Sequence, residues 1–116
     1  MNFLAADIGG SRSRLLVGDA GGGAWRVLRQ ETLASADHDG FDDLLARFLR
    51  PEDRPEVGCI ALAGPVAGAV ARMTNLPWRV DADDLARRFG LRHVRLMNDF
   101  TAQAQGLPHL DVHGIE

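Results

Sequence analysis

The chain has 116 residues, of which 46% are hydrophobic and 25% charged, with 13 basic against 16 acidic side chains and a formal net charge of −3. This composition is typical of a single globular domain and excludes a disordered chain. The negative balance argues against nucleic acid as the main partner, and no apolar run approaches the roughly 18 residues of a membrane span. The N-terminus has no signal-peptide pattern, so we expect a cytoplasmic protein without a membrane partner.

The beginning of the chain predicts three strands. Residues 3–8 form a short apolar run that ends at Gly9-Gly10, residues 14–17 resume a strand pattern, and residues 25–33 form a third strand. A glycine-rich turn at 18–23 joins the last two. Short glycine turns between consecutive strands predict an antiparallel meander.

The hydrophobic pattern then changes its period. Between residues 41 and 49 the apolar side chains recur at helical spacing, which predicts an amphipathic helix that ends before Pro51. The later elements are a buried strand at 57–63, a short extended piece at 69–73, a helix that Asp81 caps and Gly90 ends, a strand at 93–97 and a short helix from Asn98 to about Gln105. The order β-β-β-α-β-α-β-α predicts an α/β fold, a mixed sheet with helices packed on it.

The turn after the first strand contains Asp7, Gly9, Gly10 and Ser11. Glycines let backbone amides approach an anion closely, and the serine hydroxyl adds a donor. The turn leads into a strand and all basic residues are Arg, so it is neither a dinucleotide fingerprint nor a lysine-containing phosphate loop. The pattern favours a strand–turn–strand phosphate cradle in which Asp7 holds Mg²⁺ through water. A hairpin turn whose glycines serve only the backbone conformation stays the alternative.

Two polar residues, Asn98 and Asp99, follow the last predicted strand at a predicted helix start. Ligands bind at strand ends in open α/β sheets, whereas helix capping by itself would explain one of these residues. A helix N-terminus keeps a carboxylate ionised. Asp99 therefore suits the acceptance of a hydroxyl proton in phosphoryl transfer better than the role of an acid.

Four segments of the chain, taken together and in this order, carry a family resemblance. They are Ala6-Asp7-Ile8-Gly9-Gly10-Ser11 with Arg14-Leu15, residues 59–68, Met73-Thr74-Asn75-Leu76-Pro77-Trp78, and residues 97–104. The chain resembles bacterial glucokinases, of the sugar-kinase branch of the actin-like ATPase superfamily, from about residue 4 to residue 108. The third and fourth segments are strongly specific.

The resemblance implies a small lobe of ribonuclease-H-like fold at 1–106, with 107–116 as a linker towards a large lobe. It also implies transfer of the γ-phosphoryl group of ATP, with Mg²⁺, to the 6-hydroxyl of glucose. In such an enzyme Asp99 is the catalytic base, and Asn98 and Asp99 bind the sugar, with Asn75 near it. The residues that face the ATP phosphates are Ala6, Asp7, Ile8, Gly9, Gly10 and Ser11. Among them Asp7 lies nearest the metal ion.

Two departures from the family pattern matter. After the two glycines the family usually has Thr-Asn, whereas this chain has Ser11-Arg12, and Arg12 would either contact phosphate or obstruct the cleft. The family also has a large lobe with the adenosine pocket and further sugar ligands, so the 116-residue chain alone is expected to be inactive. The run from Asn75 to Trp78 has two interpretations, a contact with the sugar or a structural loop, and the sequence does not decide between them.

Other functions stay in view. A truncated sugar-kinase paralogue would be a non-catalytic module that binds sugar or another protein. A ribonuclease-H-like nuclease would need a carboxylate cluster and a basic surface, and the chain offers only Asp7 and Asp99 with a negative net charge. The single cysteine, Cys59, excludes an internal disulfide and is expected in the core as an inert residue. A homodimer, the choice among hexoses and the phosphoryl donor stay open.

Overall fold

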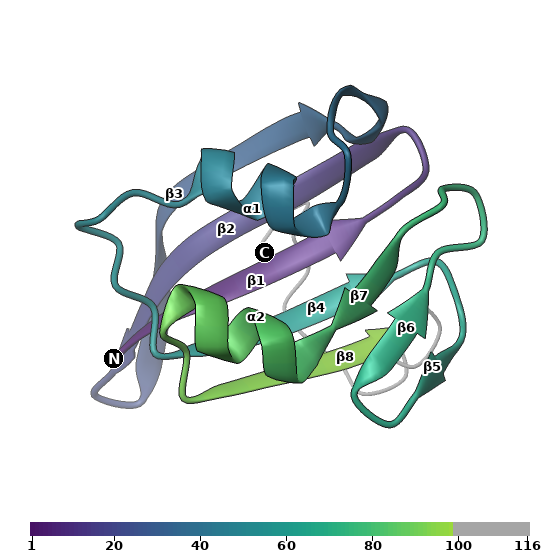
Figure 1. Ribbon diagram of the computed structural model, residues 1–116. Helices are drawn as coiled ribbons and strands as arrows, with labels where there is room; N and C mark the ends of the chain where they lie inside the picture. Colours follow the sequence, from purple (N-terminus) through teal and green to yellow (C-terminus); the bar gives the residue numbers. More distant parts are fainter. Residues whose placement is uncertain (99–116) are drawn as a thin grey trace.

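The computed structural model describes residues 1–98. Figure 1 shows a twisted sheet with two helices on one face and a small second sheet at one end. In chain order the elements are β1 (Asn2–Ile8), β2 (Arg12–Gly21), β3 (Ala24–Ala34), the 3₁₀ turn η1 (Ser35–Asp37), α1 (Phe41–Phe48), β4 (Val57–Leu62), β5 (Val66–Ala67), β6 (Val70–Arg72), β7 (Arg79–Asp81), α2 (Ala82–Phe89) and β8 (His93–Asn98). None of the helices in this part of the chain is long and apolar enough to cross a membrane.

The main sheet has five strands in the order β3-β2-β1-β4-β8. β1, β2 and β3 form the predicted antiparallel meander, and β4 and β8 add parallel strands beside β1. Parallel neighbours need crossover connections, and α1 and α2 lie in these connections on the same face of the sheet (Figure 1). The mixed α/β fold predicted from the sequence is confirmed.

The turn between β2 and β3 is shorter than the glycine-rich run predicts. Gly21 still pairs with Ala24, so Gly22 and Gly23 alone form the turn. Both have positive φ, 61° and 79°, as a two-residue type I′ hairpin turn requires, and glycine adopts this conformation without strain. A run of glycines marks a turn, but it does not show which of them continue the strands.

The core lies between the helices and the face of the main sheet that they cover. Alternate residues of β1 and β4 point into it, among them Leu4, Ile8 and Leu62, which are fully buried. Leu49, predicted as the last residue of the first helix, is instead its C-cap. The predicted apolar face of α1 is at most 1% exposed and consists of Phe41, Leu44, Leu45 and Phe48.

α2 begins and ends as the sequence predicts. A side-chain oxygen of Asp81 accepts hydrogen bonds from the N–H of Asp83 at 3.0 Å and of Asp84 at 3.1 Å. At the other end Gly90 has a φ of 71°, the left-handed conformation that commonly terminates helices. Both boundary residues of the predicted helix are therefore confirmed.

A second sheet of three strands, β5-β6-β7, is formed by the part of the chain between β4 and α2. The sequence predicts only one extended piece at 69–73, because strands of two or three residues are too short to show an alternating pattern. Figure 1 shows this sheet near the arrowheads of β4 and β8. The predicted helix after Asn98 and the predicted boundary at residue 106 lie outside the described residues.

Candidate functional site

Three parallel strands end at one edge of the main sheet. β1 ends at Ile8, β4 at Leu62 and β8 at Asn98, and these three residues lie in one register row. Ligands of open α/β sheets bind at the carboxyl ends of the strands. The candidate site is therefore at this edge, and the N-terminus of the chain lies at the far end of β1 (Figure 1).

The turn of residues 9–11 joins β1 directly to β2. The N–H of Gly9 donates to the carbonyl of Arg12 at 2.9 Å, and the chain then continues as a strand. A Cβ at Gly9 would lie 3.0 Å from that carbonyl oxygen, which is closer than most Cβ atoms in proteins lie to a non-bonded neighbour. The predicted strand–turn–strand geometry is confirmed, while the contact of this turn with phosphate stays a prediction.

Two buried serines hold the turn from the core side. Ser13 and Ser35 are both 0% exposed, and their hydroxyl oxygens lie 2.8 Å apart. Ser35 Oγ donates to the Gly9 carbonyl at 2.8 Å, and the Ser35 N–H donates to the Ser11 carbonyl at 2.9 Å. No local pattern in the sequence points to Ser35, because it lies 26 residues from Gly9 along the chain.

The loop of residues 73–78 lies against the glycine turn. Its backbone is tied to the end of β4, since the Thr74 N–H donates to the Ala63 carbonyl at 2.9 Å. A Cβ at Gly10 would lie 3.0 Å from the Cβ of Asn75, whose side chain is exposed. The structure therefore brings Asn75 and the glycine turn together.

Trp78, at the end of the same loop, has a structural role. It is 5% exposed and belongs to the hydrophobic core, so it offers no ring face to a sugar. Of the two interpretations left open by the sequence, the structural loop is the one that holds for this residue. The loop reaches its position because Gly64 has no side chain, since a Cβ there would lie 1.9 Å from the Arg72 carbonyl oxygen.

Asp7 lies on the face of the main sheet opposite the helices. Its register partners are Arg14 on β2 and Ala61 on β4, and its side chain is half-buried. Among residues 1–98, no group of three or more His, Cys, Asp and Glu side chains is arranged to hold a metal ion. Mg²⁺ is usually held by one or two carboxylates together with water and phosphate oxygens. A single carboxylate beside the glycine turn fits that donor set.

Asn98 approaches the same edge from the opposite face of the sheet. It shares the register row of Ile8 and Leu62, whose side chains point towards the helices. Because side chains alternate along a strand, Asp7 and Asn98 lie on different faces. The two predicted site residues therefore reach the carboxyl edge from opposite faces of the sheet, Asp7 from the open face and Asn98 from the helix face. Asp99, the predicted catalytic base, lies outside the described residues.

Cys59 is not in the core, contrary to the sequence-based prediction. It is half-buried and points to the same face of the sheet as Asp7. Burial raises the pKa of its thiol, although the nearby charge of Arg95 acts in the opposite direction. The thiol is therefore protonated at neutral pH, which agrees with the predicted lack of reactivity.

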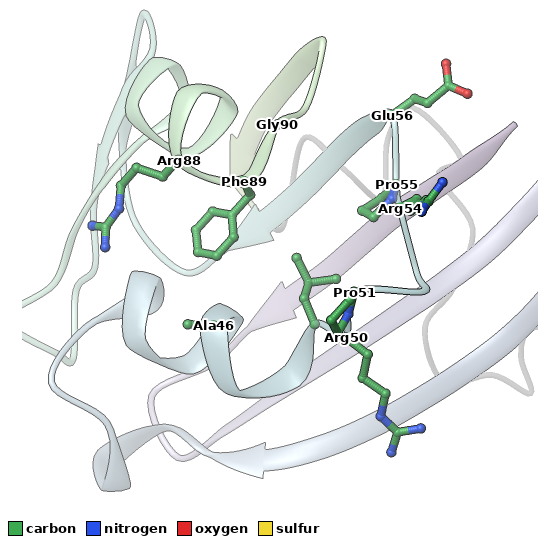
Figure 2. A pocket seen from close by; sticks show the side chains of 10 residues that line it. Ala46, Arg50, Pro51, Arg54, Pro55, Glu56, Arg88, Phe89 and Gly90 are labelled. Atoms are coloured by element: carbon green, nitrogen blue, oxygen red, sulfur yellow. The ribbon is translucent and has the colours of Figure 1, made fainter.

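A groove of about 690 Å³ lies at the opposite end of the main sheet (Figure 2). Its walls come from the end of α1, the loop before β4 and the end of α2, with Phe89 pointing into the space between them. Two of its charges are already paired, since Arg88 binds Asp42 and Arg92 binds Glu56 at 3.1 Å. Because Glu56 precedes β4, this groove is not part of the candidate site at the strand ends.

Comparison with known proteins decides the family. The glucokinase family model matches residues 4–115, almost the whole chain. The chain belongs to the glucokinase family. The glucokinase of Caulobacter vibrioides (strain NA1000 / CB15N) is 34% identical over 109 residues, which are 92% of this chain and 33% of that protein. The glucokinase of Nostoc punctiforme is 34% identical over 120 residues, 98% of this chain and 35% of that relative. This member of the glucokinase family thus spans about a third of the length of its curated relatives.

Solved structures agree on the fold of this glucokinase-family chain. A glucokinase from an Antarctic psychrotroph matches with a TM-score of 0.79 and 27% identity, covering 87% of this chain and 33% of that one. A ROK family glucokinase from Streptomyces griseus, solved in complex with glucose and AMPPNP, matches with a TM-score of 0.63 and 25% identity, covering 90% and 35%. The fold is that of the sugar kinases of the actin-like ATPase superfamily, as the sequence resemblance implied.

Proposed function

We propose that this chain forms the N-terminal lobe, residues 1–106, of a cytoplasmic enzyme that transfers the γ-phosphoryl group of ATP to the 6-hydroxyl of glucose. One observation carries the proposal. In a chain matched by the glucokinase model over residues 4–115, the glycine turn, Asn75 and Asn98 all lie at the carboxyl edge of one sheet. Phosphoryl transfer depends mainly on such positioning of the two substrates.

On the sugar side, Asn98 and Asp99 hydrogen-bond the hydroxyl groups, with Asn75 beside them. The carboxylate of Asp99 accepts the proton of the 6-hydroxyl while the hydroxyl oxygen bonds to the γ-phosphorus. The bond from that phosphorus to the bridging oxygen of ADP breaks in the same step. Because the transition state is loose, the position of Asp99 matters more than its basicity.

On the phosphate side, residues 6–11 face the phosphates of ATP. The backbone amides of the glycine turn and the hydroxyl of Ser11 donate to phosphate oxygens. Asp7 would hold Mg²⁺ through water, and the bound ion would neutralise part of the charge of the phosphates. This arrangement leaves the adenosine pocket to a second lobe, to which residues 107–116 would lead.

The related Streptomyces griseus enzyme supports both substrates, since its structure holds glucose together with AMPPNP. We assign the same two substrates to this chain because it belongs to the same family and is 25% identical to that enzyme over 90% of its length. The curated relatives are about three times as long as this chain, which agrees with the proposal of a second lobe.

Asp99→Asn in the complete gene product tests the proposed base. The substitution keeps the shape of the side chain but removes the proton acceptor. We expect kcat to fall by about 10²–10⁴-fold with the Kd for glucose nearly unchanged. A coupled assay for ADP gives kcat, and calorimetry gives the Kd for glucose.

Glu52→Gln is the matched control, because Glu52 is exposed in the loop before β4, at the opposite end of the main sheet from the strand ends. It should keep the turnover of the parent protein. A kcat of Asp99→Asn within about threefold of the parent would remove Asp99 from the role of base. A different result would be a parent protein that binds glucose without hydrolysing ATP or transferring its phosphoryl group. That result would indicate the non-catalytic sugar-binding module instead.

A further inference from the structure

Ser13 and Ser35 form a buried hydrogen-bonded pair behind the glycine turn. We propose that Ser35 is a positioning residue that orients the Gly10 amide towards the phosphates of ATP. This inference rests on the proposed function, because it requires the glycine turn to bind the phosphates of ATP.

The hydrogen bonds of the pair have a definite direction. A serine hydroxyl has one proton, and a carbonyl oxygen only accepts. The proton of Ser35 must therefore lie in the 2.8 Å bond to the Gly9 carbonyl. Ser35 Oγ then has to accept the proton of Ser13 in the other 2.8 Å contact. The result is a chain of donors, Ser13 to Ser35 to Gly9, in which each bond polarises the next.

These bonds fix the direction of the peptide planes in the turn. In a trans peptide the N–H points opposite to the carbonyl of the preceding residue. The Gly9 carbonyl points to the fully buried Ser35, so the Gly10 N–H points away from the core. Ser35 also holds the Ser11 carbonyl through its own N–H at 2.9 Å. One residue thus restrains the turn on both sides of Gly10.

An amide that already faces its anion binds it more tightly, because no reorientation has to be made during binding. The turn is also packed closely against Asn75, since a Cβ at Gly10 would lie 3.0 Å from Asn75 Cβ. Ser13 and Ser35 are both 0% exposed and cannot touch a nucleotide themselves. Any effect of Ser35 on ATP therefore passes through the conformation of the turn.

Two matched variants of the complete gene product separate positioning from stability. Ser35→Ala removes the donor to Gly9, whereas Ser13→Ala leaves that donor in place, and both delete one buried hydroxyl. We expect Ser35→Ala to raise the KM for ATP by about tenfold, with the KM for glucose changed less than about twofold. Ser13→Ala should lower the Tm comparably and change the KM for ATP by less than about threefold. Ser35→Thr, which keeps the hydroxyl, should restore the KM for ATP.

Equal KM values for ATP in Ser35→Ala and Ser13→Ala would overturn the proposal, as would equal losses for ATP and glucose. A second measurement needs no variant. In the parent protein the Gly10 amide should exchange with solvent and become protected when AMPPNP is added, and no protection would also overturn the proposal. A parent protein without ATP-dependent sugar phosphorylation would contradict the proposed function itself, which distinguishes the two failures.

Discussion

Arg12 is the residue at which the chain departs from the family pattern within the candidate site. It is the first residue of β2, and its side chain is exposed beside the glycine turn. Residues two apart on a strand share a face, so Arg12 lies on the same face as Arg14 and its register partner Asp7. This is the face on which we propose the phosphates and Mg²⁺, and it favours a phosphate contact over obstruction.

Arg12→Asn should therefore weaken the binding of ATP by about three- to tenfold and make it less sensitive to salt, because a charge-assisted hydrogen bond is lost. Calorimetry with ATP at low and at high salt measures both effects. Arg26→Asn, which removes the same charge from the far end of β3, should leave the affinity unchanged. A higher affinity in Arg12→Asn would mean that Arg12 obstructs the cleft.

Gly64 is the residue on which the position of the Asn75 loop depends. In Gly64→Ala the new Cβ would meet the Arg72 carbonyl oxygen at 1.9 Å, and backbone must move. We expect a loss of about 3 kcal/mol in the free energy of unfolding, measured in urea. Gly21→Ala is the control, since a Cβ there meets nothing within 4 Å and should change stability by less than about 0.5 kcal/mol. Similar stabilities of the two variants would contradict the close approach.

At the scale of elements, Arg29 joins β3 to α1 and to the loop before β4. Its guanidinium donates to the Phe48 carbonyl at 2.7 Å and to the carboxylate of Asp53, and it lies 4.2 Å from the centroid of the Phe48 ring. Asp53 also accepts from the Arg50 N–H at 2.8 Å. Burial by itself raises the pKa of Asp53, but the hydrogen bonds and charges of Arg29 and Arg50 outweigh it and hold the pKa below its ordinary value.

The lowered pKa of Asp53 gives stability a defined pH dependence. A carboxyl group whose pKa is lower in the folded chain stabilises the fold above its unfolded pKa, about 3.9. That contribution is lost as the pH falls through the folded pKa. Asp53→Asn should thus cost about 3 kcal/mol at pH 7, and the difference from the parent protein should shrink below about pH 4.

Urea unfolding between neutral and acidic pH measures this difference. Glu52→Gln, an exposed neighbour in the same loop, should behave as the parent protein at every pH. A difference between Asp53→Asn and the parent that stays constant with pH would show that the ionised carboxylate does not stabilise the fold.

At the scale of the whole molecule, we expect the 116-residue chain by itself to fold but not to phosphorylate glucose. Folding is expected because the helices and the main sheet already share a buried core. Catalysis is not expected because, under the proposed function, a second lobe would complete the site and close with this one over the substrates. Glucose binding should be weak, since several hydroxyl contacts of about 1 kcal/mol each are missing.

A coupled assay for ADP and glucose 6-phosphate, beside calorimetry with glucose, tests this expectation on the purified chain. Host kinases are the main source of error, so a variant of the chain with Asp99→Asn serves as the control for contamination. Glucose-dependent turnover by the chain that Asp99→Asn abolishes would contradict the need for a second lobe.

Much of the fold follows from signals that are local in the sequence. Apolar spacing located α1, Asp81 and Gly90 located the ends of α2, and the glycine turn between two apolar runs located the β1–β2 hairpin. These predictions succeed because capping, helical period and turn conformation are set within a few residues. The strands β5, β6 and β7 escape prediction because they are too short to show a period.

The candidate site depends on contacts that are distant along the chain. The sequence by itself determined the type of turn at residues 9–11 and the strand ends beside it. Only the tertiary structure decided that Ser35 holds Gly9 across 26 residues, that Gly10 lies against Asn75, and that Trp78 lies in the core. The physical reason is that these buried hydrogen bonds and close contacts join residues that are far apart in the sequence. The local sequence around each residue carries no signal of the contact, which forms only when the chain packs.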